Sequence, residues 1–435
     1  MIHVINNYYI DKDEFQYMVK KDSGKKLTVR GKEYPKYELV GCFITLPAAI
    51  EKIVDRLVSE KLSERTYELK EALDIIKDNE IDMIKSVLIA NRGEIAIRIA
   101  RTARRMGIKT YVVRTAKEPE AVYLSAADAV INFPETDGNI PEFLDIDRLV
   151  GLAREYKIDS LHPGYGYLSE NAELAERCRD NGIVFIGPSP EVIRLMGDKV
   201  AAKGIAAQSG VPMLGASQGA VHTLDEARKI AKRLGYPVII KAVSGGGGRG
   251  MRIVHHQDEL EQLYKIATAE AQVAFNDPSV FIEKYLENPK HIEFQIVADN
   301  YGNVVHLGER ECSIQRKHQK LMEEAPSPAL DERLRKKMAA AAVSLAKQAG
   351  YQSLGTVEFL LDHQKHFYFM EMNTRIQVEH PVTELVSGLD LIKEQIRVAA
   401  GEPLSVSQKD VKITGHAIEC RINAENPEKN FMPCP

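Results

Sequence analysis

The run FMEMNTRIQVEHPVT, residues 369–383, carries polar side chains at every second position. These positions are Glu371, Asn373, Arg375, Gln377 and Glu379. Alternate side chains of an extended strand share a face, so we expect this row on one face. A solvated face would carry interchangeable Lys, Thr and Ser, whereas carboxylate, amide and guanidinium groups suit a divalent cation beside a small anion. The run therefore predicts one wall of an active site.

A glycine-rich segment, KAVSGGGGRGM, spans residues 241–251. The apolar patterns YPVII and MRIV flank it and predict a loop between two strands. A Walker or Rossmann loop leads into a helix instead, and GxxxxGK[ST] does not occur. Because consecutive glycines let backbone N–H groups approach phosphate oxygens, the segment predicts a polyphosphate site with positive charge from Lys199 and Lys241. The four glycines are Gly245, Gly246, Gly247 and Gly248.

Glu358 stands inside an otherwise apolar strand pattern, GTVEFLL. A lone Glu in a strand is more often an exposed residue than a ligand. The strand FYFMEMN follows after a short turn, so a hairpin is expected to bring Glu358 beside Glu371. Two carboxylates and the amide oxygen of Asn373, completed by water and nucleotide phosphates, would form an octahedral Mg²⁺ site.

The pattern of strands and helices predicts a multidomain α/β and α+β chain. A strand at 87–90, a helix to 106 and a strand at 110–113 form a βαβ unit, and a second unit begins near residue 147; together they predict a Rossmann-like, doubly wound parallel sheet. The expected domains are 83–209 with this sheet, a lid at 210–285 with the glycine loop, and a mostly antiparallel catalytic domain at 286–435.

Residues 1–82 are expected to form a separate small α+β module. NNYYIDKDEFQYMVKK and YELVGCFITL read as strands, DSGKK as a turn, and LPAAIEKIVDRLVSEKLSE and YELKEALDIIKD as amphipathic helices. Its charge-rich helices are compatible with a partner-docking surface or with a solvated face, and its role stays open.

The composition is that of a soluble cytoplasmic protein. A chain of 435 residues is expected to form several domains. The net charge of −4 gives no nucleic-acid footprint, and neither a membrane-length apolar run nor a secretory signal occurs. The 5 cysteines lack CxxC spacing, so reduced thiols are expected.

From about residue 83 onward the chain resembles the biotin carboxylase component of biotin-dependent carboxylases, which is an ATP-grasp enzyme. The motifs that carry the resemblance follow one another in family order. They are IANRGEIAIRIARTARRMG, HPGYGYLSEN, FIGPS, MGDK, IIKAVSGGGGRGM, EKYLENPKHIEFQ, ERECSIQRKHQK, EEAPSP, GTVEFL, EMNTRIQVEHPVTE and GHAIECRINAE.

The resemblance implies a role for each matching site residue. The phosphate contacts would be Lys199, Lys241, His291, Gln315 and His318, and the adenine contacts Glu283 and Leu286. One or two Mg²⁺ or Mn²⁺ ions would bind Glu358, Glu371 and Asn373. Bicarbonate would bind Lys320, Arg375, Gln377 and the backbone of Val378. Glu379 would take the bicarbonate proton, and Arg421 would stabilise the biotin enolate.

The implied reaction is ATP-dependent carboxylation of biotin through carboxyphosphate. The implied partners are a biotin carboxyl carrier, carboxyltransferase subunits and a second copy of the chain. Fatty acid biosynthesis is an expected role, but acetyl-CoA, propionyl-CoA and pyruvate carboxylases share this component, so the final acceptor stays open. Two alternatives are another ATP-grasp ligase and a catalytically weak fragment that acts through residues 1–82.

The family continues beyond the position of Pro435 with residues that complete the sheet of the catalytic domain. We therefore expect an uncovered strand edge near GHAIECRINAE and poor carboxylation of free biotin despite MgATP binding.

Overall fold

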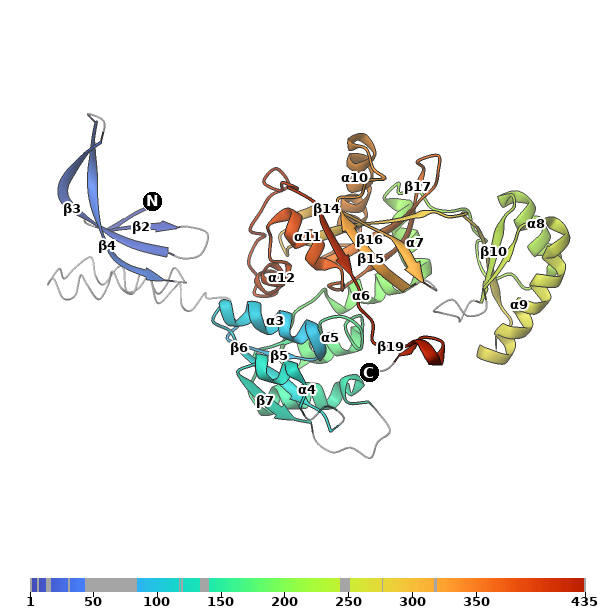
Figure 1. Cartoon of the computed structure of the whole chain (residues 1–435), viewed down its shortest axis with the longest axis horizontal. Helices are drawn as coiled ribbons and strands as arrows, with labels where there is room; N and C mark the ends of the chain where they lie inside the picture. The colour runs from blue at the N-terminus through green and yellow to red at the C-terminus, as the bar shows by residue number, and fades with distance from the viewer. Residues whose placement is uncertain are drawn as a thin grey trace. The chain divides into compact units, whose positions relative to one another are not determined.

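The structure is a computed structural model that describes residues 2–5, 8–12, 17–29, 32–43 and 84–433, with gaps at 117, 119, 134–140, 243–250, 276 and 317–318. The chain divides into two compact units, Met1–Met83 and Ile84–Pro435 (Figure 1). The second unit contains every site residue predicted from the sequence. The domain boundaries expected inside this unit stay predictions.

The first unit contains a four-stranded antiparallel sheet in the order β1-β2-β3-β4. Its strands are β1 (Ile2–Ile5), β2 (Tyr8–Lys12), β3 (Tyr17–Val29) and β4 (Lys32–Phe43). The predicted turn at DSGKK is wrong, because these residues lie inside β3, where the register with β4 shifts between Asp22 and Lys26. A β-bulge accommodates such extra residues without reversing the strand. The two helices predicted after β4 lie outside the described residues.

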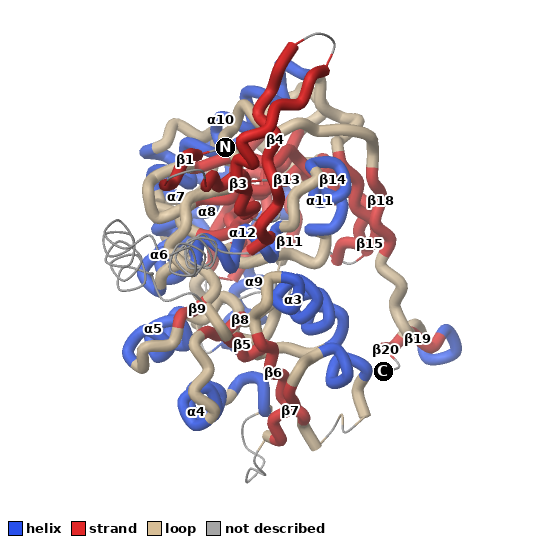
Figure 2. The backbone as a smooth tube through the Cα atoms, turned by 90° about the vertical axis from the view of Figure 1, so that its left-hand side faces the viewer, coloured by secondary structure: helices blue, strands red, loops and turns tan. Residues whose placement is uncertain are grey.

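A five-stranded parallel sheet opens the second unit, in the order β7-β6-β5-β8-β9 (Figure 2). Its strands are β5 (Ser86–Ile89), β6 (Lys109–Arg114), β7 (Ala129–Asn132), β8 (Ser160–His162) and β9 (Val184–Phe185). Its helices are α3 (Gly93–Arg105), α4 (Ile146–Glu155) and α5 (Ala172–Asp180). This arrangement confirms the predicted doubly wound sheet, whose strands are mostly buried because helices flank it.

The helices α6 (Pro190–Gly197) and α7 (Lys199–Gln208) lead from the parallel sheet to a small three-stranded sheet. This sheet has the order β11-β10-β12 and is covered by α8 and α9. Its elements are α8 (Leu224–Leu234), β10 (Val238–Ala242), β11 (Arg252–Val254), α9 (Leu260–Phe275) and β12 (Val280–Lys284). Antiparallel pairing of β10 with β11 confirms that the glycine segment joins two strands.

A six-stranded antiparallel sheet carries most of the predicted site, in the order β17-β16-β13-β14-β15-β18. Its strands are β13 (Lys290–Ala298), β14 (Val304–Arg316), β15 (Gln319–Ala325), β16 (Ser353–Leu361), β17 (Phe367–Asn373) and β18 (Ala417–Cys420). In the described part of the chain, β18 pairs only with β15 and forms one edge of this sheet.

The alternation of side chains along β13 separates the core from the site. Ile292, Phe294 and Ile296 enter a hydrophobic core with α10 (Glu332–Gln348), which covers one face of the sheet (Figure 1). Glu293 and Gln295 consequently project to the opposite face. That face is covered by α11 (His380–Ser387) and α12 (Leu391–Ala399).

The prediction of one continuous strand through residue 379 is wrong. Strand β17 ends at Asn373, and Arg375, Gln377 and Glu379 lie on the connection that leads into α11. Pro381 in the first turn of α11 explains the change, because proline suits a helix start and provides no N–H for a strand ladder.

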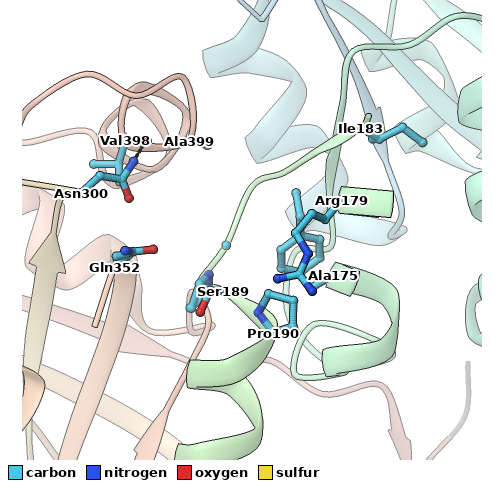
Figure 3. A pocket seen from close by; sticks show the side chains of 12 residues that line it. Ala175, Arg179, Ile183, Ser189, Pro190, Asn300, Gln352, Val398 and Ala399 are labelled. Carbon is cyan, nitrogen blue, oxygen red and sulfur yellow. Dashed lines mark hydrogen bonds between the residues drawn. The ribbon is translucent and has the colours of Figure 1, made fainter. Parts of the chain in front are cut away.

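A pocket of about 220 Å³ lies where the parallel-sheet region meets the turn after β13 and the end of α12 (Figure 3). Arg179, Ser189, Asn300 and Gln352 are among its polar lining residues. None of the predicted site residues that the structure describes lines it, so the pocket is distinct from the side-chain cluster described next. Across the described ranges, no helix combines the length and apolar character needed to span a membrane.

Candidate active site

Lys320 is the centre of a buried charge cluster on the face covered by α11. Its Nζ lies 2.5 Å from Glu293, 2.7 Å from Glu379 and 3.0 Å from Glu358. These carboxylates come from three separate segments, which the antiparallel sheet and the α11 connection bring together. Burial opposes the charged form, yet the three carboxylates raise the pKa of Lys320. Lys320 is therefore a fixed cation.

Arg310 lies behind this cluster and is fully buried. It donates hydrogen bonds to Glu293 at 2.6 Å and to the side-chain oxygen of Gln377 at 2.7 Å. Further acceptors are Gln295, Thr356 and Thr383. With its donors shared among five side chains, the guanidinium holds Gln377 and Glu293 in fixed orientations.

Glu379 lies between two cations. One carboxylate oxygen is 2.7 Å from Lys320, and the other is 2.9 Å from Arg421. Arg421 also donates through Nε to Glu323 at 2.6 Å. Because Glu379 is buried at 2% exposure, this arrangement places a carboxylate in a confined, cation-lined space.

Glu358 and Glu371 are direct cross-strand partners in the hairpin of β16 and β17, as predicted. Glu371 is exposed as a whole residue, but desolvation of its carboxyl, followed by the negative charges of Glu358 and Glu170, raises its pKa. Among the described residues, Glu371 has no hydrogen-bond donor, although Glu358 accepts one from Asn373 at 2.7 Å. A carboxylate left beside another carboxylate without a donor suits a divalent cation, and the hard oxygen donors fit Mg²⁺.

His291 and Gln315 adjoin this carboxylate pair. His291 Nε2 lies 2.7 Å from Glu358, and its Nδ1 lies 3.0 Å from the Gln315 amide nitrogen. Burial opposes protonation of His291, but contact with Glu358 raises its pKa. The pair therefore places an imidazole and an amide beside the proposed metal position.

Glu283 in β12 contacts two lysines, with its oxygens 2.6 Å from Lys241 and 2.5 Å from Lys203. Burial favours its neutral form, but Lys241 and Lys203 lower the pKa of Glu283 to about 2. Lys199 begins α7 on an exposed surface, and Leu286 is half-buried just after β12. Of the predicted nucleotide contacts, Lys241, Glu283 and Leu286 therefore lie at or next to β10 and β12, whereas His291 and Gln315 lie on β13 and β14. Lys199 lies close enough to Glu371 to oppose the rise in the pKa of that carboxyl.

Arg375 is tied to the region that carries the parallel sheet. Its Nε donates to Glu170 at 3.0 Å, and its NH2 donates to the side-chain oxygen of Asn373 at 3.1 Å. Glu170 also accepts from the Thr374 backbone at 3.1 Å. Val378 follows on the same connection and is half-buried.

Gly245, Gly246, Gly247, Gly248 and His318 lie outside the described residues. Of the cysteines, Cys178, Cys312 and Cys420 are free, as expected. Burial raises the pKa of the Cys312 thiol well above its ordinary value, so this residue is a poor nucleophile.

The sequence motifs did not predict that Glu293, Arg310, Glu323 or Glu170 would be part of the site. The first two interrupt apolar strand patterns in HIEFQIVA and VVHLGERECS. That interruption is a usable signal, because an unpaired charge in a buried strand is costly. The pairing itself joins residues distant in sequence and could not be predicted from either pattern.

Comparison with known families agrees with the predicted resemblance. Residues 83–193 match the biotin carboxylase N-terminal domain, and residues 198–407 match the ATP-binding domain of the carbamoyl-phosphate synthase L chain. A biotin carboxylase from a Nostoc species is 55% identical over 80% of this chain and 78% of its own length. One pyruvate carboxylase subunit, from Methanothermobacter thermautotrophicus, is 52% identical over 81% of this chain and 72% of its own length.

Solved structures give the same result. The biotin carboxylase–βγ-ATP complex from Campylobacter jejuni has a TM-score of 0.75 and 48% identity, covering 82% of this chain and 79% of that one. The biotin carboxylase domain dimer of Hydrogenobacter thermophilus 2-oxoglutarate carboxylase, with MgADP, ADP and bicarbonate, has a TM-score of 0.74 and 49% identity. It covers 81% of this chain and 77% of that one. By fold, by motif order and by this degree of identity, the chain belongs to the biotin carboxylase family.

Proposed function

We propose that the chain catalyses the ATP- and bicarbonate-dependent carboxylation of biotin, the first half-reaction of a biotin-dependent carboxylase. The observation that carries the proposal is the placement of Glu379 between Lys320 and Arg421, beside the Glu358–Glu371 pair. This arrangement brings three carboxylates and two cations together, which supports the roles of base and metal ligands that we propose for the carboxylates. Another ATP-grasp ligase and a silent fragment have no support among the relatives.

In the first step, bicarbonate attacks the γ-phosphorus of ATP, and the bond to the leaving ADP oxygen breaks. Lys320, Arg375, Gln377 and the Val378 backbone orient bicarbonate, and Glu379 accepts its proton. Arg310 fixes the side-chain oxygen of Gln377, and the amide nitrogen donates to Glu358 at 3.0 Å. Positioning and charge neutralisation are the principal contributions to phosphoryl transfer.

The nucleotide is held by the remaining predicted residues. Glu283 and Leu286 contact adenine, and the phosphates are contacted by the glycine segment and by Lys199, Lys241, His291, Gln315 and His318. Lys241 exchanges its present partner Glu283 for phosphate oxygens. Glu358, Glu371 and Asn373 hold Mg²⁺ or Mn²⁺, which neutralises phosphate charge when it is bound.

In the second step, carboxyphosphate separates into CO₂ and phosphate. Phosphate removes the N1 proton of biotin, and the resulting enolate attacks CO₂ through nitrogen to form the N–C bond. Arg421 stabilises the negative charge on the ureido oxygen, since a guanidinium stays cationic and presents several donors in a fixed plane.

We further propose that biotin is carried by a carrier protein or domain and that carboxyltransferase subunits receive the carboxyl group. The Methanothermobacter relative, which is one component of a pyruvate carboxylase, supports such partners, and the dimeric structural neighbour supports a homodimer. A cytoplasmic location is consistent with these partners. The final acceptor is left to experiment, and co-purification with a biotinylated carrier would identify it.

The test is ADP formation measured with ATP and Mg²⁺, with and without bicarbonate and free biotin. Biotin carboxylase activity predicts little ADP without bicarbonate and faster ADP formation when biotin is added, although the sequence predicts that free biotin is a poor substrate for this chain. ADP formation that responds to an amine or carboxylate acceptor but not to biotin would indicate a different ATP-grasp ligase.

A further inference from the structure

A second pair of carboxylates lies behind Arg421. Glu323 in β15 and Glu419 in β18 are direct partners in the antiparallel register. Glu323 is fully buried, and Glu419 is partly buried. Within the described chain, one carboxylate oxygen of each residue is buried without a hydrogen-bond partner. Such groups are costly in a protein interior, so the pair calls for a specific explanation.

Glu323 is the main anchor of the Arg421 guanidinium. Its Oε1 lies 2.6 Å from Nε and 2.5 Å from NH2 of Arg421. The other carboxylate contact of Arg421 is Glu379, at 2.9 Å from NH2. Glu379 accepts a proton during the proposed reaction, so its attraction for Arg421 changes as the reaction proceeds. Glu323 takes no part in that proton transfer and provides a constant anchor.

The backbone alone fixes Arg421 weakly. Strand β18 ends at Cys420, and the Arg421 N–H donates to the Leu321 carbonyl at 2.9 Å. The next residue, Ile422, is 92% exposed, so it provides no packing that would restrain the chain beyond this hydrogen bond. A long side chain at such a position has many rotamers, and the contact with Glu323 selects among them.

The two carboxylates are too close to ionise independently. Burial, then the charges of Glu323 and Glu379, raises the pKa of Glu419 to about 7. Burial likewise raises the pKa of Glu323, although Arg421 opposes this. The other titratable groups that face the pair are Lys320, Arg310 and Tyr165. Near neutral pH the pair therefore holds a proton for part of the time.

We propose that Glu323 is a positioning residue that directs the Arg421 guanidinium toward the ureido oxygen of biotin, with Glu419 as the neighbour that modulates its charge. This inference rests on the proposed function. It assigns Glu323 to the biotin half of the reaction, because among the described residues Glu323 hydrogen-bonds to Arg421 and to none of the proposed metal, adenine or phosphate ligands.

The first test compares Glu323→Gln with a matched control, Glu324→Gln. Glu324 is the next residue of β15, points to the opposite face and pairs with His416 at 3.0 Å. For Glu323→Gln, we expect biotin-dependent kcat/KM to fall by about tenfold to a hundredfold, the cost of a misplaced catalytic group. The ATP KM and the biotin-independent ATPase rate should stay close to wild type. Glu324→Gln should resemble wild type throughout.

Glu323→Asp provides a second variant, since it keeps the negative charge while shortening the side chain. Its biotin turnover should lie between those of wild type and Glu323→Gln.

The pH profile of Glu419→Gln gives a readout that a merely structural role would not change. As wild-type Glu419 ionises, its charge competes for Arg421, so the ratio of variant to wild-type biotin kcat/KM should rise as the pH increases through about 7.

The outcomes separate this inference from the proposed function. A wild-type chain without biotin-dependent ADP formation would contradict the function itself. An active wild type with unchanged biotin kinetics in Glu323→Gln would overturn the positioning role. Equal losses of ATP affinity, biotin-independent ATPase and biotin turnover would also overturn it, because they would show general damage to the fold. A flat pH ratio for Glu419→Gln would remove Glu419 from the proposal.

Discussion

Replacing Lys320 with Met should destabilise the second unit strongly, and more so at high pH. The ammonium contacts three carboxylates, at 2.5, 2.7 and 3.0 Å, and its side chain is only 14% exposed. Methionine has a similar length and no charge, so the substitution leaves the carboxylates without their shared cation. Removing one partner of a buried ion pair costs about 3–5 kcal/mol.

The other cations in the cluster limit this loss. Glu293 keeps Arg310 at 2.6 Å, and Glu358 keeps His291 at 2.7 Å. We therefore expect the single-pair value of about 3–5 kcal/mol for all three contacts together, rather than three times that amount.

The pH dependence follows from the pKa directions. Lys320 lowers the pKa of Glu293 and Glu358 against the effect of burial. Carboxylates with a depressed folded-state pKa stabilise the fold above the unfolded pKa, and that stabilisation is lost as the pH falls through the folded pKa. Without Lys320 these carboxylates take up protons more readily, so the variant should lose most stability at about pH 8 and less at about pH 6.

Thermal unfolding followed by far-UV circular dichroism would measure the effect, since the chain has 0 Trp for fluorescence. The matched control is Lys336→Met, because Lys336 is 75% exposed and pairs with Glu332 at 3.3 Å on the surface of α10. An exposed pair contributes about 0–1 kcal/mol, so the control should be close to wild type. A Lys320→Met protein as stable as the control at both pH values would refute the charge-cluster argument.

Three further predictions concern catalysis and charge. Glu379→Gln keeps the shape but loses the basic oxygen, so bicarbonate-dependent turnover should fall by about a hundredfold or more with ATP affinity nearly unchanged; unaltered turnover would remove Glu379 from the base role. The double variant Glu358→Gln with Glu371→Gln should lose Mg²⁺-dependent ATP turnover, and full activity at low Mg²⁺ would contradict the metal site. Glu419→Gln removes a carboxylate whose pKa is raised to about 7, so the variant should melt at a higher temperature than wild type. The difference in melting temperature should grow as the pH rises toward that value and then level off, and a difference that is constant with pH would contradict the raised pKa of Glu419.

The sequence allowed prediction of features that depend on neighbouring segments. The βαβ unit and the hairpin that pairs Glu358 with Glu371 are both local, because short connections determine which strands meet. The glycine segment between β10 and β11 was predictable for the same reason. Family resemblance added the roles of residues such as Arg421, which periodicity alone does not indicate.

Features that depend on distant segments were not predictable. Arg310 and Glu293 lie on adjacent strands, but their contacts with Gln377 and Lys320 depend on how the α11 connection folds over the sheet. The polar alternation through Glu379 continued past the end of β17, and Pro381 decided the change from strand to helix. The segment DSGKK has a turn-like composition, yet a bulge inside β3 accommodates it.

The most direct test of the central claim follows oxygen atoms from bicarbonate. A mechanism through carboxyphosphate forms a bond between a bicarbonate oxygen and the γ-phosphorus of ATP, so that oxygen leaves in inorganic phosphate. With heavy-oxygen bicarbonate, ATP, Mg²⁺ and biotin, mass spectrometry should find one labelled oxygen in each phosphate released and carboxybiotin in equal amount. Unlabelled phosphate, or phosphate release without carboxybiotin, would contradict the account.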